Sequence, residues 1–107
     1  MDREASDLGL GRFSEPALLI LVSLADGAKH GYAMMEDIEA LSGARLGAGT
    51  LYGALGRLER RGLIEPLPAE DRRRPYRLTA AGAAVLQEQL ASMRSFATAG
   101  LQRLAAT

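Results

Sequence analysis

Arginines dominate the residues of this chain that could do chemistry. Three of them are adjacent, Arg72 to Arg74, and Arg57 precedes them in a segment of small residues and hydroxyl groups. Neighbouring cations repel one another until a polyanion offsets their charge, and guanidinium groups suit the oxygens of a phosphate. The cluster therefore predicts phosphate binding, with an ordinary solvated loop tip as the alternative.

Catalytic and metal chemistry find little support in the same sequence. The chain has no cysteine and a single histidine, His30. It carries no phosphate-binding glycine loop and no evident pair of catalytic carboxylates. We therefore expect no enzymatic activity, no metal and no cofactor. Because His30 precedes Gly31 at an expected helix start, a capping or packing role is favoured over ligand binding.

The charge of the chain is zero in sum but uneven in distribution. Residues 57–77 contain seven arginines and four acidic residues, a balance of +3, and the remainder of the chain balances this with −3. A neutral protein with one basic edge can still hold phosphates at that edge.

The bulk properties indicate one folded domain outside the membrane. The chain has 107 residues, of which 48% are hydrophobic, so it can bury a modest core. The longest apolar run, Ala17 to Val22 with Leu24, is too short to span a bilayer. No segment resembles a signal peptide, and the absence of cysteine excludes disulfides. We expect a cytoplasmic protein.

The most informative segment is a helix predicted over Ala48 to Arg61. Leu51, Leu55 and Leu58 share one face, which should be buried. The outward positions are Gly49, Thr50, Tyr52, Gly53, Gly56 and Arg57.

Two outward side chains of this helix are candidate contacts with a polyanion. Tyr52 follows Leu51 and so points away from the buried face, although it could instead prop the helix against a neighbour. Arg57 has no acidic residue three or four positions away on its own helix, which favours phosphate as its partner.

Two helices should precede this one. The first spans Glu15 to Leu24, begins at a Ser14 cap and should be buried on all sides. The second spans Gly31 to Leu41, and its buried stripe should hold Tyr32, Met35, Ile38 and Leu41. A glycine-containing turn over residues 42–47 then completes a helix-turn-helix.

The remaining elements complete a winged helix. Gly62 should end the Ala48 to Arg61 helix in the left-handed conformation, and two strands should follow over Leu63 to Leu67 and Pro75 to Leu78. The segment between them, Pro68 to Arg74, is too polar and too long for a tight turn and should project as a wing. The predicted fold class is mainly α with a small two-stranded wing.

A long helix capped by Thr79 should run from Ala80 to about Leu104. Its apolar residues are spaced nearly as in a coiled coil: Leu86, Leu90, Met93, Ala97, Leu101 and Leu104. We divide the chain into a flexible arm (1–12), a winged helix-turn-helix domain (13–78) and a dimerisation helix (79–107).

Five motifs in order resemble the PadR family of bacterial transcriptional regulators. They are Leu24-Ala-Asp-Gly-Ala-Lys-His-Gly-Tyr32, Gly49-Thr-Leu-Tyr52, Arg57-Leu-Glu59, Gly62-Leu-Ile64 and Arg73-Arg-Pro-Tyr-Arg-Leu-Thr79 with Gly82. The resemblance covers about Phe13 to Leu104 and is closest to the subfamily with a single C-terminal helix.

The resemblance implies a homodimer that binds double-stranded DNA. Thr50, Tyr52 and Arg57 would lie on the recognition helix, and Arg72, Arg73 and Arg74 would form the wing. The dimer would be built on the last helix and the first, through Leu18, Leu86, Leu90, Met93, Ala97, Leu101 and Leu104. An inducer pocket at the interface could be lined by Phe13, Met34, Met93 and Phe96, although such methionines are more often plain core.

We therefore predict a dimeric repressor on a roughly palindromic operator, released by a small molecule or a stress signal. The chain departs from the usual family pattern at Gly53 and Gly56, and each interior glycine costs a helix about 1 kcal/mol relative to alanine. The alternative is a winged-helix module that binds proteins and no DNA.

Overall fold

The structure is a computed structural model that describes residues 15–107. The elements in chain order are α2 (Pro16–Leu24), β1 (Lys29–His30), α3 (Gly31–Ser42), α4 (Ala48–Arg60), β2 (Ile64–Pro66), β3 (Pro75–Leu78) and α5 (Ala80–Ala106). The predicted arm over residues 1–12, Phe13 and the proposed Ser14 cap lie outside the described residues.

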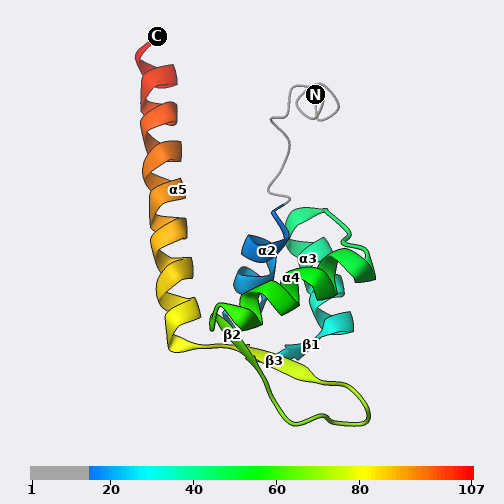
Figure 1. The fold of residues 1–107 in the computed structure, drawn as a ribbon. Coiled ribbons are helices and arrows are strands. Elements are labelled where there is room, and N and C mark those ends of the chain that lie inside the picture. Colours follow the sequence, from blue (N-terminus) through cyan, green and yellow to red (C-terminus); the bar gives the residue numbers. More distant parts are fainter. Residues whose placement is uncertain (1–14) are drawn as a thin grey trace.

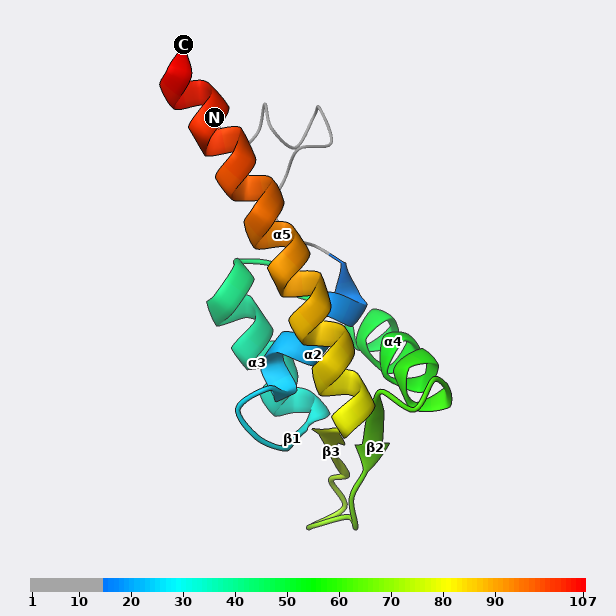
Figure 2. The ribbon, with the colours of Figure 1, turned by 90° about the vertical axis from the view of Figure 1, so that its left-hand side faces the viewer.

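Three short helices gather above a small sheet, and the long helix α5 rises from the edge of the sheet (Figure 1). Figure 2 shows that the first half of α5 passes across α2 while the second half extends beyond the helical cluster. At 27 residues α5 is about 40 Å long. None of the helices within residues 15–107 combines the length and apolar character needed to cross a bilayer. The predicted fold class, mainly helical with a wing and a long last helix, is confirmed.

Helix α2 is the centre of the core. Ile20 and Leu24 have almost no exposed surface, and α2 contacts α3, α4, α5 and β3. Leu18 and Val22 are only partly buried, so the prediction of burial on all sides is nearly correct.

A small polar network ties the end of α2 to α3 and β1. The hydroxyl of Ser23 is buried and donates to Asp37 Oδ2 at 2.6 Å. The Lys29 ammonium donates to the Ser23 carbonyl and pairs with Asp26 Oδ1 at 2.5 Å. These hydrogen bonds satisfy the buried hydroxyl and fix the start of β1 beside the core.

The buried face of α3 differs from the prediction. Ile38 is fully buried, as predicted, and Met35 is partly buried. Tyr32 and Leu41, however, are 56% and 57% exposed, and Met34, which lies outside the predicted stripe, is fully buried. Apolar residues occur on more than one side of this helix, so periodicity alone did not select the correct stripe. Packing against α2 and α4 selects Met34 and Ile38.

Helix α4 follows the prediction closely. Leu51, Leu55 and Leu58 are buried, and Gly62 takes a left-handed φ of 75° after the helix ends. The Leu63 N–H donates to the Leu58 carbonyl at 3.0 Å, which closes the helix end and turns the chain into β2.

The sheet has three antiparallel strands in the order β1–β3–β2, one strand more than predicted. Both predicted strands are present, with β2 shorter than expected. The added strand β1 pairs Lys29 with Tyr76 and His30 with Pro75. A two-residue strand has no readable pattern of its own, and it exists here because β3 has a free edge beside it.

The joint between β2, β3 and α5 is tightly built around Thr79. Its hydroxyl donates to the Gly62 carbonyl at 2.7 Å and accepts from the Gly82 N–H at 3.0 Å. Its backbone N–H donates to the Leu63 carbonyl at 3.1 Å. A Cβ atom on Gly82 would overlap this same carbonyl, whose carbon lies 2.9 Å from that position. Only glycine lets α5 begin so close to the chain leaving α4.

We expect Gly82→Ala to lower the free energy of unfolding by about 2 kcal/mol, because the added methyl group forces α5 away from Leu63. Gly53→Ala is the matched control, since a Cβ there meets only the end of the Arg57 side chain at 3.6 Å. That control should gain about 1 kcal/mol of stability. Urea denaturation measures both, and equal stabilities would contradict the role of Gly82.

Candidate nucleic-acid interface

The outward face of α4 carries the side chains that the sequence predicted for it. Thr50, Tyr52 and Arg57 are all exposed. Arg57 forms no ion pair with any residue in the part of the chain that the structure describes, so its charge is available to an external anion.

Tyr52 combines the two roles that the sequence left open. Its side chain is 52% exposed, yet its ring lies against the first residue of α3. A Cβ atom on Gly31 would come within 2.8 Å of Tyr52 Cζ, so the absence of a side chain at Gly31 makes room for the ring. The Tyr52 ring thus packs between α4 and the start of α3, and about half of its side chain remains exposed to solvent.

The two glycines of α4 lie beneath arginine side chains. A Cβ on Gly53 would be 3.6 Å from Arg57 Nη1, and a Cβ on Gly56 would be 3.4 Å from Arg60 Nη1. Both guanidinium groups therefore fold back along the helix, one turn towards its N-terminus. Because Gly53 and Gly56 have no side chains, the guanidinium groups of Arg57 and Arg60 can lie close to the backbone of α4.

The wing ends in a tight turn, which corrects the expectation that its sequence forbids one. Glu70 and Arg73 exchange two backbone hydrogen bonds, at 2.7 and 2.8 Å. Between them Asp71 and Arg72 have positive φ values of 48° and 66°. Two residues with positive φ inside such a pair form the primed turn of a hairpin, in which asparagine and glycine are the usual occupants. The wing is long, but its tip is a two-residue hairpin.

The three wing arginines have few partners. Arg74 Nη1 donates to the Leu67 carbonyl at 3.1 Å, and Arg73 Nη1 lies 3.4 Å from His30 Nε2. Within residues 15–107, no carboxylate pairs with Arg72, Arg73 or Arg74. Their positive charges therefore remain available to an external anion.

A hollow of about 290 Å³ joins the wing to α4. Its wall holds three tyrosines and three arginines and no acidic residue: His30, Gly31, Tyr32, Tyr52, Arg72, Arg73, Arg74 and Tyr76. Burial raises the pKa of the Tyr76 hydroxyl above its usual range, and the negative charge of Glu59 adds to this effect. Tyr76 therefore stays a neutral hydroxyl that can donate a hydrogen bond. The hollow is suited to a phosphate backbone rather than to a cation.

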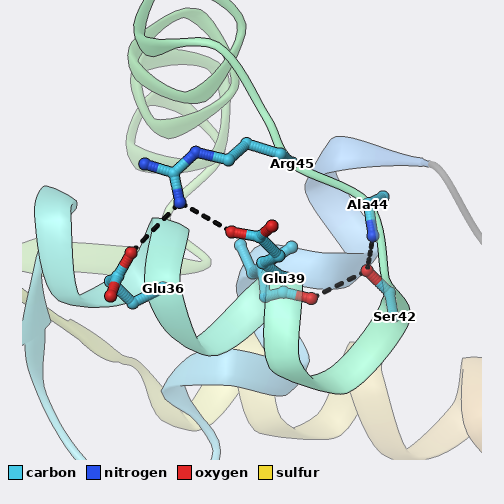
Figure 3. Close-up of polar contacts among 6 residues, drawn as sticks. Glu36, Glu39, Ser42, Ala44 and Arg45 are labelled. Atoms are coloured by element: carbon cyan, nitrogen blue, oxygen red, sulfur yellow. Dashed lines mark hydrogen bonds and ion pairs between the residues drawn. The ribbon is translucent and has the colours of Figure 1, made fainter.

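Arg45, in the turn before α4, is neutralised within the chain (Figure 3). Its Nη1 atom lies 3.1 Å from Glu36 Oε2 and 2.7 Å from Glu39 Oε1, and these hydrogen bonds raise the pKa of the Arg45 guanidinium. The Ser42 hydroxyl also donates to the Ile38 carbonyl at 2.8 Å and accepts from the Ala44 N–H. This cation ties the turn of the helix-turn-helix to α3, and two carboxylates of α3 offset its charge.

Comparison with known proteins agrees with this arrangement. The sequence profile of the family described as "Transcriptional regulator PadR-like family" matches residues 20–88, more than half of the chain. The chain belongs to the PadR-like family. This family consists of transcriptional regulators, which agrees with the expectation that the chain is not an enzyme.

Solved regulators share the fold of this PadR-like chain. A PadR family transcription regulator from Clostridium difficile is 26% identical with a TM-score of 0.74, covering 83% of this chain and 97% of its own. A transcriptional regulator from Clostridium thermocellum is 27% identical with a TM-score of 0.68, covering 78% and 86%.

A curated relative is longer than this chain. An uncharacterised 37.1 kDa protein in transposon Tn4556 of Streptomyces fradiae is 49% identical over 82 residues, 77% of this chain. The chain spans about a quarter of that protein's length, 24%.

An apolar surface of this PadR-like regulator lies away from the wing arginines. A groove of about 650 Å³ between α2, α3 and α5 is lined by Leu18, Val22, Leu41, Leu90 and Met93, among others. Leu101 and Leu104 lie exposed on the distal part of α5, as does Ala97. Of the predicted dimerisation residues, Leu86 is misplaced. It is 4% exposed and packs in the chain's own core, because the first turns of α5 lie against α2.

Among the described residues of the predicted inducer pocket, Met34, Met93 and Phe96 do not line one common hollow. Met34 has no exposed surface and belongs to the core, so that assignment is wrong. Met93 lines the apolar groove, whereas Phe96 is 84% exposed on α5. Phe13 lies outside the described residues.

Sequence reasoning missed three residues of the arginine-lined hollow. His30 caps α3 as predicted, through Nδ1, which accepts from the Ala33 N–H at 3.3 Å, but its other nitrogen faces the wing. Tyr32 was assigned to the core, and Tyr76 was noted only within a family motif. The sequence His30-Gly31-Tyr32 carries a usable signal, since a glycine at a helix start often marks a close approach.

We expect Arg72→Gly to raise the free energy of unfolding by about 0.5–1 kcal/mol, because it relieves an unfavourable left-handed φ. Arg74→Gly is the control, since Arg74 has no positive φ. It should lower stability, because glycine loses more backbone freedom on folding and the hydrogen bond to the Leu67 carbonyl is removed. Chemical denaturation compares the two, and a loss of stability in both variants would contradict strain at the wing tip.

Proposed function

We propose that this PadR-like regulator binds double-stranded DNA with α4 in the major groove and the wing on the neighbouring phosphates. The observation that carries this proposal is the hollow of unpaired arginines and tyrosines between the wing and α4. Phosphate contacts would position the protein, and Thr50 and Tyr52 would approach the bases. In this proposal residues 13–78 form the DNA-binding domain.

The distribution of charge supports the proposal although the net charge is zero. The cations that form ion pairs within residues 15–107 are Lys29, Arg45 and Arg77, and all lie outside the hollow or at its margin. The cations of the wing and Arg57 are unpaired. Intramolecular pairing thus leaves free charge along the wing and α4, where a polyanion would lie.

The regulator would act as a homodimer through residues 79–107. Phe96, Leu101 and Leu104 expose large apolar surfaces on the distal half of α5, and the same chain offers an apolar groove beside α2. Two copies related by a two-fold axis would bury both features at once. Their α4 helices would then reach successive major grooves of a roughly palindromic site, about 34 Å apart.

In this proposal the protein is a cytoplasmic repressor, and a small molecule or a stress signal releases it from the DNA. A signal that changes the angle between the two α5 helices would change the separation of the two α4 helices. The joint at Thr79 supports this coupling, since its hydroxyl bonds the end of α4 to the first turn of α5.

The first test is fluorescence anisotropy on the DNA upstream of the protein's own gene, across a series of salt concentrations. We expect a slope of log affinity against log salt of about −5 or steeper, since each neutralised phosphate contributes about −0.9. Replacing Arg72 by Gln should flatten the slope by about one for each phosphate that is no longer neutralised. Arg72→Gly should weaken DNA binding while stabilising the fold.

Arg103→Gln is the matched control, because Arg103 is exposed in the last turn of α5. The C-terminal end of α5 lies far from the wing (Figure 1). This variant should leave the slope unchanged. If the wild-type protein binds no DNA even at low salt, the alternative of a protein-interaction module takes the place of this proposal.

The dimer has its own test. Leu101→Glu should convert the protein to a monomer in sedimentation velocity, because a carboxylate would be buried in the α5 interface. Gln102→Glu adds the same charge one position further along the helix and should leave the dimer intact. A wild-type monomer at micromolar concentration would refute the dimer without bearing on the fold of the winged helix.

A further inference from the structure

His30 occupies a position from which it serves both α3 and the wing. It is the last residue of β1, paired with Pro75 of β3, and it is the N-cap of α3. Its Nδ1 atom accepts a hydrogen bond from the Ala33 N–H at 3.3 Å. Because β3 leads out of the wing, the same pairing sets the imidazole at the base of the wing.

The cap fixes which nitrogen of the ring carries the proton. A neutral imidazole has one donor nitrogen and one acceptor nitrogen. With Nδ1 assigned as the acceptor of the Ala33 N–H, the proton of a neutral imidazole lies on Nε2. That atom lies 3.4 Å from Arg73 Nη1, which is also a donor and never an acceptor. Two donors therefore face each other with no acceptor between them.

The surroundings of this pair show on which side an acceptor would lie. His30 and Arg73 form the ridge between two hollows, since both residues line both. The hollow on one side, about 560 Å³, already contains the carboxylates of Glu70 and Asp71. The hollow on the α4 side contains Arg72, Arg74 and three tyrosines and no carboxylate. On the first side the two carboxylates offset the charges of Lys29 and Arg73, whereas the second side holds three arginines and no carboxylate, so an anion is favoured on the second side.

We infer that His30 and Arg73 clamp one phosphodiester oxygen of the DNA backbone, with His30 donating from Nε2 and Arg73 from its guanidinium. This inference rests on the proposed DNA binding. It adds His30, which lies outside α4 and the wing, to the residues that would contact the DNA. The phosphate oxygen supplies the acceptor that the pair lacks, and it lies beside the other cations of the α4-side hollow. His30 contributes a hydrogen bond from Nε2, and Arg73 contributes a positive charge.

His30→Asn separates the clamp from the cap. Asparagine is a good N-cap, so its side-chain oxygen can still accept from Ala33, but its amide is too short to replace Nε2. We expect an unchanged unfolding midpoint and DNA binding weakened roughly three- to tenfold, the range for removal of one hydrogen bond. In a buffer at about pH 8, where a histidine side chain is ordinarily neutral, the salt slope should not change. Arg73→Gln should weaken binding and also flatten the slope.

The tautomer gives a test that needs no DNA. Nitrogen-15 correlation spectra of the histidine side chain in the free full-length protein should place the proton on Nε2. A proton on Nδ1 would overturn the inference, because Nε2 would then accept from Arg73 and the pair would need no phosphate. DNA binding by His30→Asn equal to that of the wild type would also overturn it. If the wild type binds no DNA, the proposed function fails, while the tautomer still decides whether the donor pair exists.

Discussion

Thr79 joins the end of α4 to the start of α5 through its side chain and its backbone together. The hydroxyl donates to Gly62 and accepts from Gly82, and the N–H donates to Leu63. This arrangement requires the first turn of α5 to lie almost in contact with the Leu63 carbonyl, which only Gly82 permits. The chain that leaves the helix that would read DNA is thus fastened to the first turn of the helix that would form the dimer. Through this joint a rotation of α5 would be passed on to α4.

The wing depends on a second constraint, the antiparallel pairing of β1 with β3. Although β1 has two residues, it connects the wing to the core through Lys29, whose ammonium is held by Ser23 and Asp26. The same pairing carries His30 to the foot of the wing. At the other end, the tip holds Arg72 in a left-handed conformation that glycine would adopt without strain. A strained arginine at an exposed tip favours a function for its side chain over a role in stability.

The structure indicates a role for the two glycines of α4 that the sequence did not show. From the sequence they weaken the helix and remove side chains that could contact bases. In the structure Arg57 and Arg60 fold back over Gly53 and Gly56, so that the low helix surface carries charge. This favours a regulator that relies on phosphates for much of its affinity, in keeping with its small number of outward polar side chains on α4.

Local sequence was enough to predict the order of the elements, the buried face of α4, the left-handed turn at Gly62 and the Thr79 cap. Each of these depends on periodicity or on the conformational preference of one residue, which neighbours in the chain reveal. Packing between distant segments was needed to show that Met34 rather than Tyr32 faces the core, that Leu86 packs within its own chain, and that β1 is a strand. Those outcomes depend on which surface lies opposite in the folded chain. The same holds for the arginines: spacing marked them as cations, but the fold alone distinguishes Arg45, held by two glutamates, from the unpaired arginines of the wing.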